Sequence, residues 1–371
     1  MKASLAEPRG PDTGRSTADV IARYLSALKR RYLLMGALTV LLIALALQAV
    51  ALGAYDLSPL KVLWALLGRA EGPQAAVIWN IRLPRIVAAV VTGWGLGLSG
   101  LATQTLLRNP LASPFTLGIS HGAIFGAAFA IVFLGAGAVS ASALHTAGPA
   151  DFMFSGLYAI TGLAFAGAMS ATVVILILAR LRKMSPSAVI LAGVAMSSLF
   201  ISGTILIQYF ATEIEIASVV FWTFGDVARS SWGEILLLGL VTLAVTLYFL
   251  RRRWELNALL AGDDSAQGLG VSVTRLRLTG MFLATLATAL ANAFHGVIAF
   301  LGLLAPHIAR RMVGGDHRFL VPLSGLVGAL LLLAADTLGR LAVGSGTLPV
   351  GVLTSFMGAP LFLYLLLKDR P

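Results

Sequence analysis

Residues 251–271, with the sequence RRRWELNALLAGDDSAQGLGV, form the one long charged interruption in the second half of a very apolar chain. About five hydrophobic segments precede this stretch and about five follow it, each long enough to suggest a membrane helix. The three arginines at its start place it on the cytoplasmic side, because loops rich in Lys and Arg stay inside. We therefore take residues 251–275 as a cytoplasmic loop that joins two halves of a membrane protein.

The pattern inside this loop predicts two short helices at the membrane surface. The apolar run 256–260 ends before Gly262, and residues 264–267 (Asp-Ser-Ala-Gln) resemble a capping box that starts a second turn. Gly268 and Gly270 are suited to ending that turn, because Gly tolerates left-handed backbone geometry. Such a shape suits contact with another protein, and an ordinary solvated loop is the alternative.

The composition is that of a polytopic membrane protein. Of the 371 residues, 58% are hydrophobic and 12% are charged, against roughly 25% charged in soluble domains. The chain has no Cys, which excludes disulfides and thiolate metal sites. The net charge of +11 comes from short basic clusters between apolar spans, which favours anchoring at the inner face over nucleic-acid binding. Residues 1–31 are polar, and we expect them to form a cytoplasmic extension.

Ten membrane helices are expected, since about 20 apolar residues cross a hydrocarbon core. They are placed near residues 33–52, 86–107, 115–138, 156–179, 188–210, 232–250, 278–295, 297–309, 319–339 and 348–367. A turn near His295-Gly296 separates the seventh from the eighth, because one helix over 278–309 would be about 48 Å long. This topology puts most basic residues and both termini in the cytoplasm. Arg82-Leu83-Pro84-Arg85 and Arg275-Leu276-Arg277 open helices five apart, which indicates inverted five-helix halves.

No group of residues in the sequence indicates catalysis. There is no G-x-x-x-x-G-K-[ST] phosphate loop, and the five histidines lack zinc-binding spacing. Asp336 lies inside an expected span, near its outer end, which makes it a functional candidate. Arg340 follows one helical turn later, so a local ion pair is the favoured interpretation. An ion-coupled transporter would be expected to carry more acidic residues than this one.

Several blocks of the sequence resemble the FecCD-type permeases, which are the membrane subunits of ABC importers for iron–siderophores, haem and cobalamin. The first half carries Ile81-Arg82-Leu83-Pro84-Arg85, Leu98-Ser99-Gly100, Arg108-Asn109-Pro110-Leu111-Ala112 and Leu117-Gly118-Ile119-Ser120. The second half carries Ala261-Gly262, Gly268-Leu269-Gly270, Phe300-Leu301-Gly302-Leu303, Pro306-His307-Ile308-Ala309-Arg310, Asp316-His317-Arg318, Ala335-Asp336, Leu348-Pro349-Val350-Gly351 and Gly358-Ala359-Pro360. The blocks are ordered and correctly spaced over roughly residues 33–369.

The resemblance implies a homodimer in the bacterial inner membrane, with ten helices per subunit and a pathway along the dimer axis. Two ATPase subunits would bind on the cytoplasmic side and a substrate-binding protein on the outer side. ATP and Mg would bind to the ATPase, so this chain itself would hold no cofactor and no metal. Residues 32–371 would form the transmembrane permease domain, with the coupling loop at 251–275.

The resemblance also assigns three groups of residues. ATPase contact is assigned to Leu256, Leu259, Leu260, Gly262, Asp263, Asp264, Ala266, Gln267, Leu269 and Gly270. Docking of the binding protein is assigned to Arg82, Arg85 and Arg340, and the inner gate to Asn109, Leu111, Ser185 and Ser187. Gln267 stands where an Arg is common in the family. His121 and His295 stand where small residues are usual, and hydrogen-bonded packing is favoured for both over substrate contact.

The sequence thus predicts the permease of a bacterial ABC importer for an iron(III) chelate, with a siderophore as the expected ligand. Haem or cobalamin import by the same mechanism is the alternative within this class. An ion-coupled secondary transporter is the alternative from a different class. ATP-dependent uptake that requires a second chain would separate the two classes.

Overall fold

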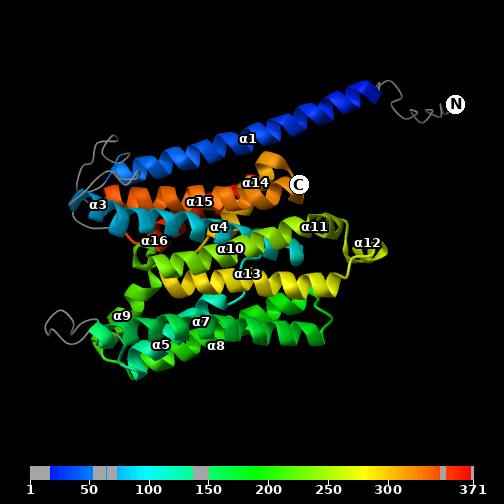
Figure 1. Cartoon of the computed structure of the whole chain (residues 1–371). Helices are drawn as coiled ribbons and strands as arrows, with labels where there is room; N and C mark the ends of the chain where they lie inside the picture. The colour runs from blue at the N-terminus through cyan, green and yellow to red at the C-terminus, as the bar shows by residue number, and fades with distance from the viewer. Residues whose placement is uncertain (1–16, 53–63, 65–72, 137–149, 343–347, 369–371) are drawn as a thin grey trace, which may run out of the picture.

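A computed structural model describes residues 17–52, 64, 73–136, 150–342 and 348–368. Within these ranges the chain is helical and contains no strand. The elements are α1 (Thr17–Ala51), α3 (Pro73–Val77), η1 (Ile78–Arg82), α4 (Leu83–Leu106), α5 (Ile119–Phe133), α7 (Ala150–Leu181), α8 (Pro186–Tyr209), α9 (Glu213–Thr223), η2 (Val227–Arg229), α10 (Trp232–Arg251), α11 (Arg253–Leu260), α12 (Asp263–Gly268), α13 (Val273–His295), α14 (Leu301–Val313), α15 (His317–Ala342) and α16 (Val350–Lys368). The long helices form a bundle, with α1 along one edge and α5, α7 and α8 at the other (Figure 1).

Every expected membrane helix has a counterpart in this bundle. Among the described residues, 7 helices are long and apolar enough to cross a membrane, within α1, α4, α7, α8, α10, α13 and α15. Shorter apolar helices lie at Ile119–Phe133 and Val350–Pro360, and α14 supplies the remaining one. The all-helical, multi-pass fold is confirmed. The cytoplasmic position of both termini and the inverted relation of the halves stay predictions.

Two elements differ from the hydropathy pattern. Helix α1 begins at Thr17 rather than near residue 33, because apolar residues such as Ile21, Leu25 and Leu28 keep helical spacing and no Gly or Pro interrupts residues 17–35. Helix α9 was not expected. It begins at a capping box in which Thr212 N–H donates to Glu215 Oε2 at 2.8 Å.

Helix α4 lies at the centre of the bundle, packed against α13, α14 and α15. Small residues permit this position, because glycines let two backbones approach closely. A Cβ atom added at Gly93 or Gly97 would clash with the backbone of α15, and one at Gly100 would clash with that of α14. Gly122 and Gly126 of α5 meet the backbone of α7 in the same way. Close packing, the simpler explanation of these small residues, is confirmed.

The expected turn at His295-Gly296 is also confirmed. Helix α13 ends at His295, and Gly296 has a φ of +76°, a left-handed value that favours Gly. Phe300 has a φ of +63° and caps the next helix, so α14 begins at Leu301 rather than at residue 297. The two left-handed residues, Gly296 and Phe300, therefore move the start of α14 from the expected residue 297 to Leu301.

Candidate functional site

The loop after α10 folds into the two short helices that the sequence predicts, α11 and α12. Gly262, with a φ of +113°, lies between them, and Gly270, with a φ of +84°, follows α12. The capping box predicted at residues 264–267 is wrong. Gly262 is the N-cap residue and makes no side-chain cap, while the Asp263 carboxylate is turned towards Arg277.

The residues assigned to ATPase contact divide between two faces of this loop. Leu256 and Leu259, 1% and 0% exposed, pack into the core together with Ala266. Leu260 and Leu269 are 54% and 73% exposed. Asp264, Gln267 and Gly270 are exposed as well, and Gly262 and Asp263 are intermediate. The inner group holds the loop in place, and the outer group is accessible to a partner.

Sequence reasoning missed Trp254, which is exposed beside the assigned residues of α11. The sequence feature that could have identified it is its position as an aromatic residue directly after the arginines at 251–253. Large exposed aromatic side chains are enriched at protein interfaces, so Trp254 joins Leu260 and Leu269 as an accessible apolar residue of the loop.

Arg277 connects the loop to two distant segments. Its guanidinium is buried in α13 and donates to Leu106 O at 2.6 Å, to Met184 O at 2.9 Å and to the Asp263 carboxylate at 3.0 and 3.1 Å. A buried guanidinium is tolerated only when its donors are satisfied and its charge is paired. The sequence showed Arg277 only as one of several basic residues, although its position between Leu276 and Leu278 signals burial.

The residues assigned to the inner gate lie directly after the carbonyl groups that Arg277 holds. Asn109 follows the last turn of α4, and its Oδ1 accepts from Leu111 N–H at 2.9 Å. Ser185 is the N-cap of α8, with its Oγ accepting from Ala188 N–H at 3.4 Å. Leu111 and Ser187 are exposed. The structure therefore brings both gate segments to the coupling loop through one side chain.

Both gate segments contain backbone in the left-handed region without Gly. Arg108 has a φ of +49°, while Lys183 and Met184 have φ values of +53° and +56°. Such residues cost free energy and persist only where surrounding contacts fix them. The hydrogen bond from Arg277 to Met184 O and the 3.8 Å ion pair of Arg108 with Asp263 are contacts of this kind.

A second polar connection joins α11 to α4. Asn257 Oδ1 can only accept, so His317 Nδ1 donates to it at 2.7 Å, which leaves His317 Nε2 to accept from the Thr105 hydroxyl at 2.9 Å. Asn257 Nδ2 donates to Asp316 at 3.1 Å. Burial acts to raise the pKa of Asp316, but hydrogen bonds from Arg318 N–H and Asn257 lower it overall. Each short helix of the loop thus has its own link to the end of α4.

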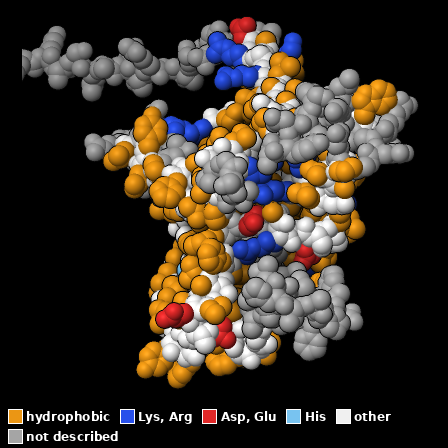
Figure 2. Space-filling model, turned by 90° about the vertical axis from the view of Figure 1, so that its left-hand side faces the viewer, with side chains coloured by type: hydrophobic (Ala, Val, Ile, Leu, Met, Phe, Trp, Pro, Cys, Tyr) orange, Lys and Arg blue, Asp and Glu red, His pale blue; other side chains and the backbone are white. Residues whose placement is uncertain are grey.

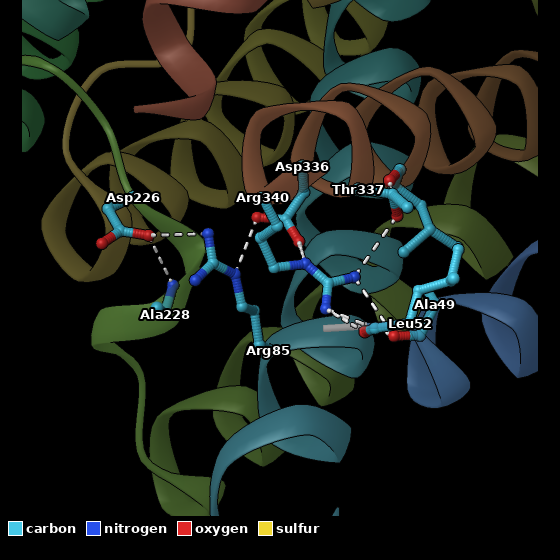
Figure 3. Close-up of polar contacts among 9 residues, drawn as sticks. Ala49, Leu52, Arg85, Asp226, Ala228, Asp336, Thr337 and Arg340 are labelled. Carbon is cyan, nitrogen blue, oxygen red and sulfur yellow. Dashed lines mark hydrogen bonds and ion pairs between the residues drawn. The ribbon is translucent and has the colours of Figure 1, made fainter. Parts of the chain in front are cut away.

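The three arginines assigned to the binding protein lie near Asp336 or the end of α1, and Figure 3 shows two of them, Arg85 and Arg340. Asp336 is fully buried and pairs with Arg85 at 2.9 Å and with Arg340 at 3.3 Å. The predicted Asp336–Arg340 ion pair is confirmed, and Arg85 is a second partner. Arg82 donates to Val50 O at 2.6 Å.

These arginines hold several helices together. Arg340 donates to Ala49 O and Leu52 O, so α1, α4 and α15 meet at this end. Arg85 also lies 3.8 Å from Asp226, which precedes η2. Figure 2 shows basic side chains around an acidic one in the middle of this end of the molecule. All three guanidiniums have partners within the chain, and their side chains are mostly buried.

The two histidines have different surroundings. His295 is buried, with Nε2 2.5 Å from Ser230 Oγ and Nδ1 3.2 Å from Thr92 Oγ1, so it joins α13 to α4 and to the segment before α10. This is the hydrogen-bonded packing that we favoured. His121 is half-buried, and its ring lies 5.4 Å from that of Phe115. No group of His and acidic residues able to hold a metal occurs in the described part of the chain.

Comparison with known proteins places these features in one family. The model of the FecCD transport family matches residues 39–368. An ABC transporter permease protein of Methanocaldococcus jannaschii is 49% identical, with 94% of this chain and 98% of that protein covered. The hemin transport system permease of Yersinia pestis is 35% identical, and the Fe(3+)-citrate import system permease of Bacillus subtilis is 37% identical. In both pairs, 91% of this chain and 96% of the relative are covered.

A solved structure supports the same assignment. An inward-facing metal-chelate type ABC transporter superposes with a TM-score of 0.76 at 32% identity, covering 90% of this chain and 99% of that one. The helix order, the two-helix loop and the sequence blocks therefore lead to one conclusion: this chain belongs to the FecCD transport family and is a membrane-spanning permease of an ABC importer.

Proposed function

We propose that this chain imports an iron(III) chelate, with a siderophore as the preferred ligand class. The relative named for Fe(3+)-citrate import supports an iron complex, and the solved transporter of metal-chelate type supports a metal chelate more generally. The relative named for hemin transport makes haem the second candidate. The chain acts as a homodimer in the inner membrane, together with ATPase subunits and a substrate-binding protein. ATP and Mg²⁺ bind to the ATPase, since this sequence has no phosphate loop.

The contacts of Arg277 carry the proposal that ATP hydrolysis and the gate are coupled. The ATPase contacts the exposed residues of α11 and α12, of which Trp254, Leu260 and Leu269 offer apolar surface. A displacement of α12 moves Asp263 and, through it, the guanidinium of Arg277. The guanidinium in turn transmits the displacement to the carbonyl groups of Leu106 and Met184. Those carbonyl groups immediately precede the two gate segments. Packed and hydrogen-bonded groups that form a contiguous chain can carry such coupling, and these groups are contiguous.

The hydrogen bonds of His317 support the same proposal, coupling of the loop to the gate, for α11. A displacement of Asn257 reaches Thr105, one residue before the carbonyl group that Arg277 holds. Both helices of the loop therefore act on the last turn of α4, which leads directly to Asn109. We assign the loop as the coupling element and the segments at Asn109 and Ser185 as the inner gate.

The basic cluster at the opposite end is proposed to attract the binding protein. Arg82, Arg85 and Arg340 carry three positive charges against the two negative charges of Asp226 and Asp336, which leaves one net positive charge. Because all three arginines bind groups of the chain itself, their contribution is a local positive field rather than three free guanidiniums. Such fields act mainly on association rate and specificity.

Reconstitution tests the proposed function directly. The permease is placed in liposomes with its ATPase and binding protein, and uptake of a ferric hydroxamate, ferric citrate and haem is compared. We expect uptake of the ferric chelates to require ATP and to resist proton and sodium ionophores. Uptake by the permease alone that collapses with an ionophore would instead establish ion coupling. Uptake of haem without either ferric chelate would establish the second candidate.

A further inference from the structure

Two adjoining cavities share lining residues of α10 and α13: the first lies between these helices and α7, and the second between them, α11 and the segment after α12. Figure 1 shows α11 and α12 at one end of the bundle. The first, about 470 Å³, is lined mostly by apolar side chains, among them Leu176, Ile177 and Phe282. Its one charged lining residue is Arg180, in the last turn of α7. A cavity of this size and lining takes an apolar molecule or chain.

The second cavity, about 390 Å³, is polar. It is lined by Arg252, Glu255, Ser272 and Arg275, while Tyr248 and Thr279 line both cavities. The hydroxyl groups of Tyr248 and Thr279 lie 2.6 Å apart in a hydrogen bond. The two cavities thus form one groove that changes from apolar to polar at this pair of hydroxyl groups.

The groove carries uncompensated positive charge, from Arg180 beside the apolar cavity and from Arg275 beside the polar one. Arg252 is paired with Glu255, but the exposed side chains of Arg180 and Arg275 make no ion pair within the part of the chain that the structure describes. Arg180 lies in the last turn of α7 and Arg275 lies in the first turn of α13, so two helices place positive charge at the same end of the bundle. These charges lie where the positive-inside rule puts the inner membrane surface.

An apolar groove with basic residues at its membrane-surface end matches the form of a phospholipid. Basic pockets between membrane helices on the cytoplasmic side bind anionic headgroups, and guanidinium groups bind phosphate through paired, charge-assisted hydrogen bonds. An ordinary lipid-facing surface would need neither the apolar hollow between helices nor two arginines without ion pairs beside it.

We propose that this groove binds one anionic phospholipid of the inner leaflet, such as phosphatidylglycerol. An acyl chain occupies the apolar cavity, and the headgroup phosphate lies at the end that Arg180 and Arg275 line. Leu269 and Gly270 also line the polar cavity, so the headgroup contacts the end of the coupling loop. The binding itself requires neither ATP nor a chelate, so its test is independent of the proposed transport function.

Lipid retention tests the charged end of the groove. The full-length permease, purified with its ATPase from a mixture of phosphatidylglycerol and phosphatidylcholine, is examined by native mass spectrometry. The wild type should retain phosphatidylglycerol in preference. Arg180→Gln and Arg275→Gln should each reduce retention about fivefold, which corresponds to about 1 kcal/mol per basic residue. Arg182→Gln, exposed beyond the end of α7 and lining neither cavity, is the matched control. Equal retention by the double variant and the control overturns the proposal.

Filling the apolar cavity tests the acyl chain separately. Ile177→Trp leaves every arginine in place and should also reduce retention of phosphatidylglycerol. If that variant does not co-purify with the ATPase, Val173→Trp fills the same cavity from a second exposed position, one helical turn earlier on α7. Added inorganic phosphate should not displace the lipid. Full retention by a folded Trp variant, or displacement by phosphate, would show that the arginines attract a phosphate group without a lipid chain, and the proposal would be wrong.

Discussion

Arg277 of α13 and Asp263 of α12 are joined by two parallel hydrogen bonds, of 3.0 and 3.1 Å, across the start of the loop helix. The arginine is buried, whereas the aspartate side chain is 32% exposed. The pair therefore lies at the boundary between the bundle core and the coupling loop. Bidentate contact of this kind fixes orientation as well as distance, so α12 cannot turn without turning the guanidinium.

The first prediction concerns this pair. Asp263→Asn keeps the size of the side chain but removes the charge that compensates buried Arg277. We expect the free energy of unfolding to fall by about 1–3 kcal/mol, the cost of an imperfectly satisfied buried group. We also expect fewer substrate molecules imported per ATP hydrolysed, because the loop loses its fixed connection to the gate. Thermal unfolding and the ratio of uptake to ATP hydrolysis measure the two effects.

Glu213→Gln is the control, since Glu213 is exposed at the start of α9, has no assigned role in the loop, and makes no ion pair within the described ranges. It should leave both quantities unchanged. A normal ratio of uptake to hydrolysis in a stable Asp263→Asn complex would remove Arg277 from the coupling route.

The second prediction concerns the exposed face of the loop. Leu260→Asp together with Leu269→Asp should abolish co-purification of the ATPase without lowering the thermal stability of the permease, because both side chains are exposed. Leu181→Asp is an exposed control at the end of α7. Leu259→Asp should instead destabilise the fold by about 3–5 kcal/mol, because it places an unpaired charge in the core. Retained ATPase in the double variant would contradict the assigned contact surface.

The third prediction concerns Asp336. Asp336→Asn leaves the partly buried cations Arg85 and Arg340 facing each other without their shared carboxylate, and should cost about 3–5 kcal/mol. Asp226→Asn removes only a contact of 3.8 Å and should cost about 0–1 kcal/mol. Thermal unfolding of the two variants in the same lipid compares them. Equal stability losses would show that Asp336 is not the centre of this cluster.

The fourth prediction concerns docking of the binding protein. Arg85→Gln keeps N–H donors for Asp336 and removes one positive charge. Affinity for the binding protein should fall by about 0.2–1 kcal/mol at low salt, and the loss should shrink at high salt, where screening already weakens the wild-type attraction. Binding is measured on protein of confirmed stability. A loss that does not depend on salt would indicate a structural effect rather than an electrostatic one.

The fifth prediction concerns the contact between α4 and α14. Gly100→Ala places a methyl group against the backbone at Gly302, and should cost about 1–3 kcal/mol through overpacking. Gly36→Ala in α1 meets no atom within 4 Å and should stabilise the helix by about 0.4–1 kcal/mol. Thermal unfolding should therefore shift in opposite directions. Two shifts of the same sign would contradict the close approach of the backbones.

Much of the fold follows from apolar length and charge position. The ten helices, the turn at His295-Gly296 and the two loop helices could be predicted because each depends on local patterns. The start of α1 at Thr17 could not be predicted in this way. Hydropathy marks only the apolar part of this helix, whereas the charged residues from 23 to 31 continue the same helix beyond the membrane surface. Helix α9 had a local signal at Thr212 and Glu215 that hydropathy does not weigh.

The contacts within the site could not be predicted from local sequence patterns. Arg277 binds a carbonyl group 171 positions earlier in the chain and another 93 positions earlier. Main-chain acceptors of this kind have no side-chain signature. The burial of Leu256 and Leu259 and the internal partners of Arg82, Arg85 and Arg340 likewise depend on how helices meet. Family resemblance identified the residues, but only the packed structure shows which of their atoms are free.

The glycine contacts described above define two groups of helices, here called bodies, within which backbones touch. One contains α4, α14 and α15, and the other contains α5 and α7, because within each body backbones touch directly. Backbones that touch slide poorly across their own contact, so we expect alternation between inward-open and outward-open states to shift one body against the other. Arg277 spans this joint, from Leu106 in the first body to Met184 just beyond the second. Its bonds to Leu106 and Met184 cannot both be kept when the bodies part.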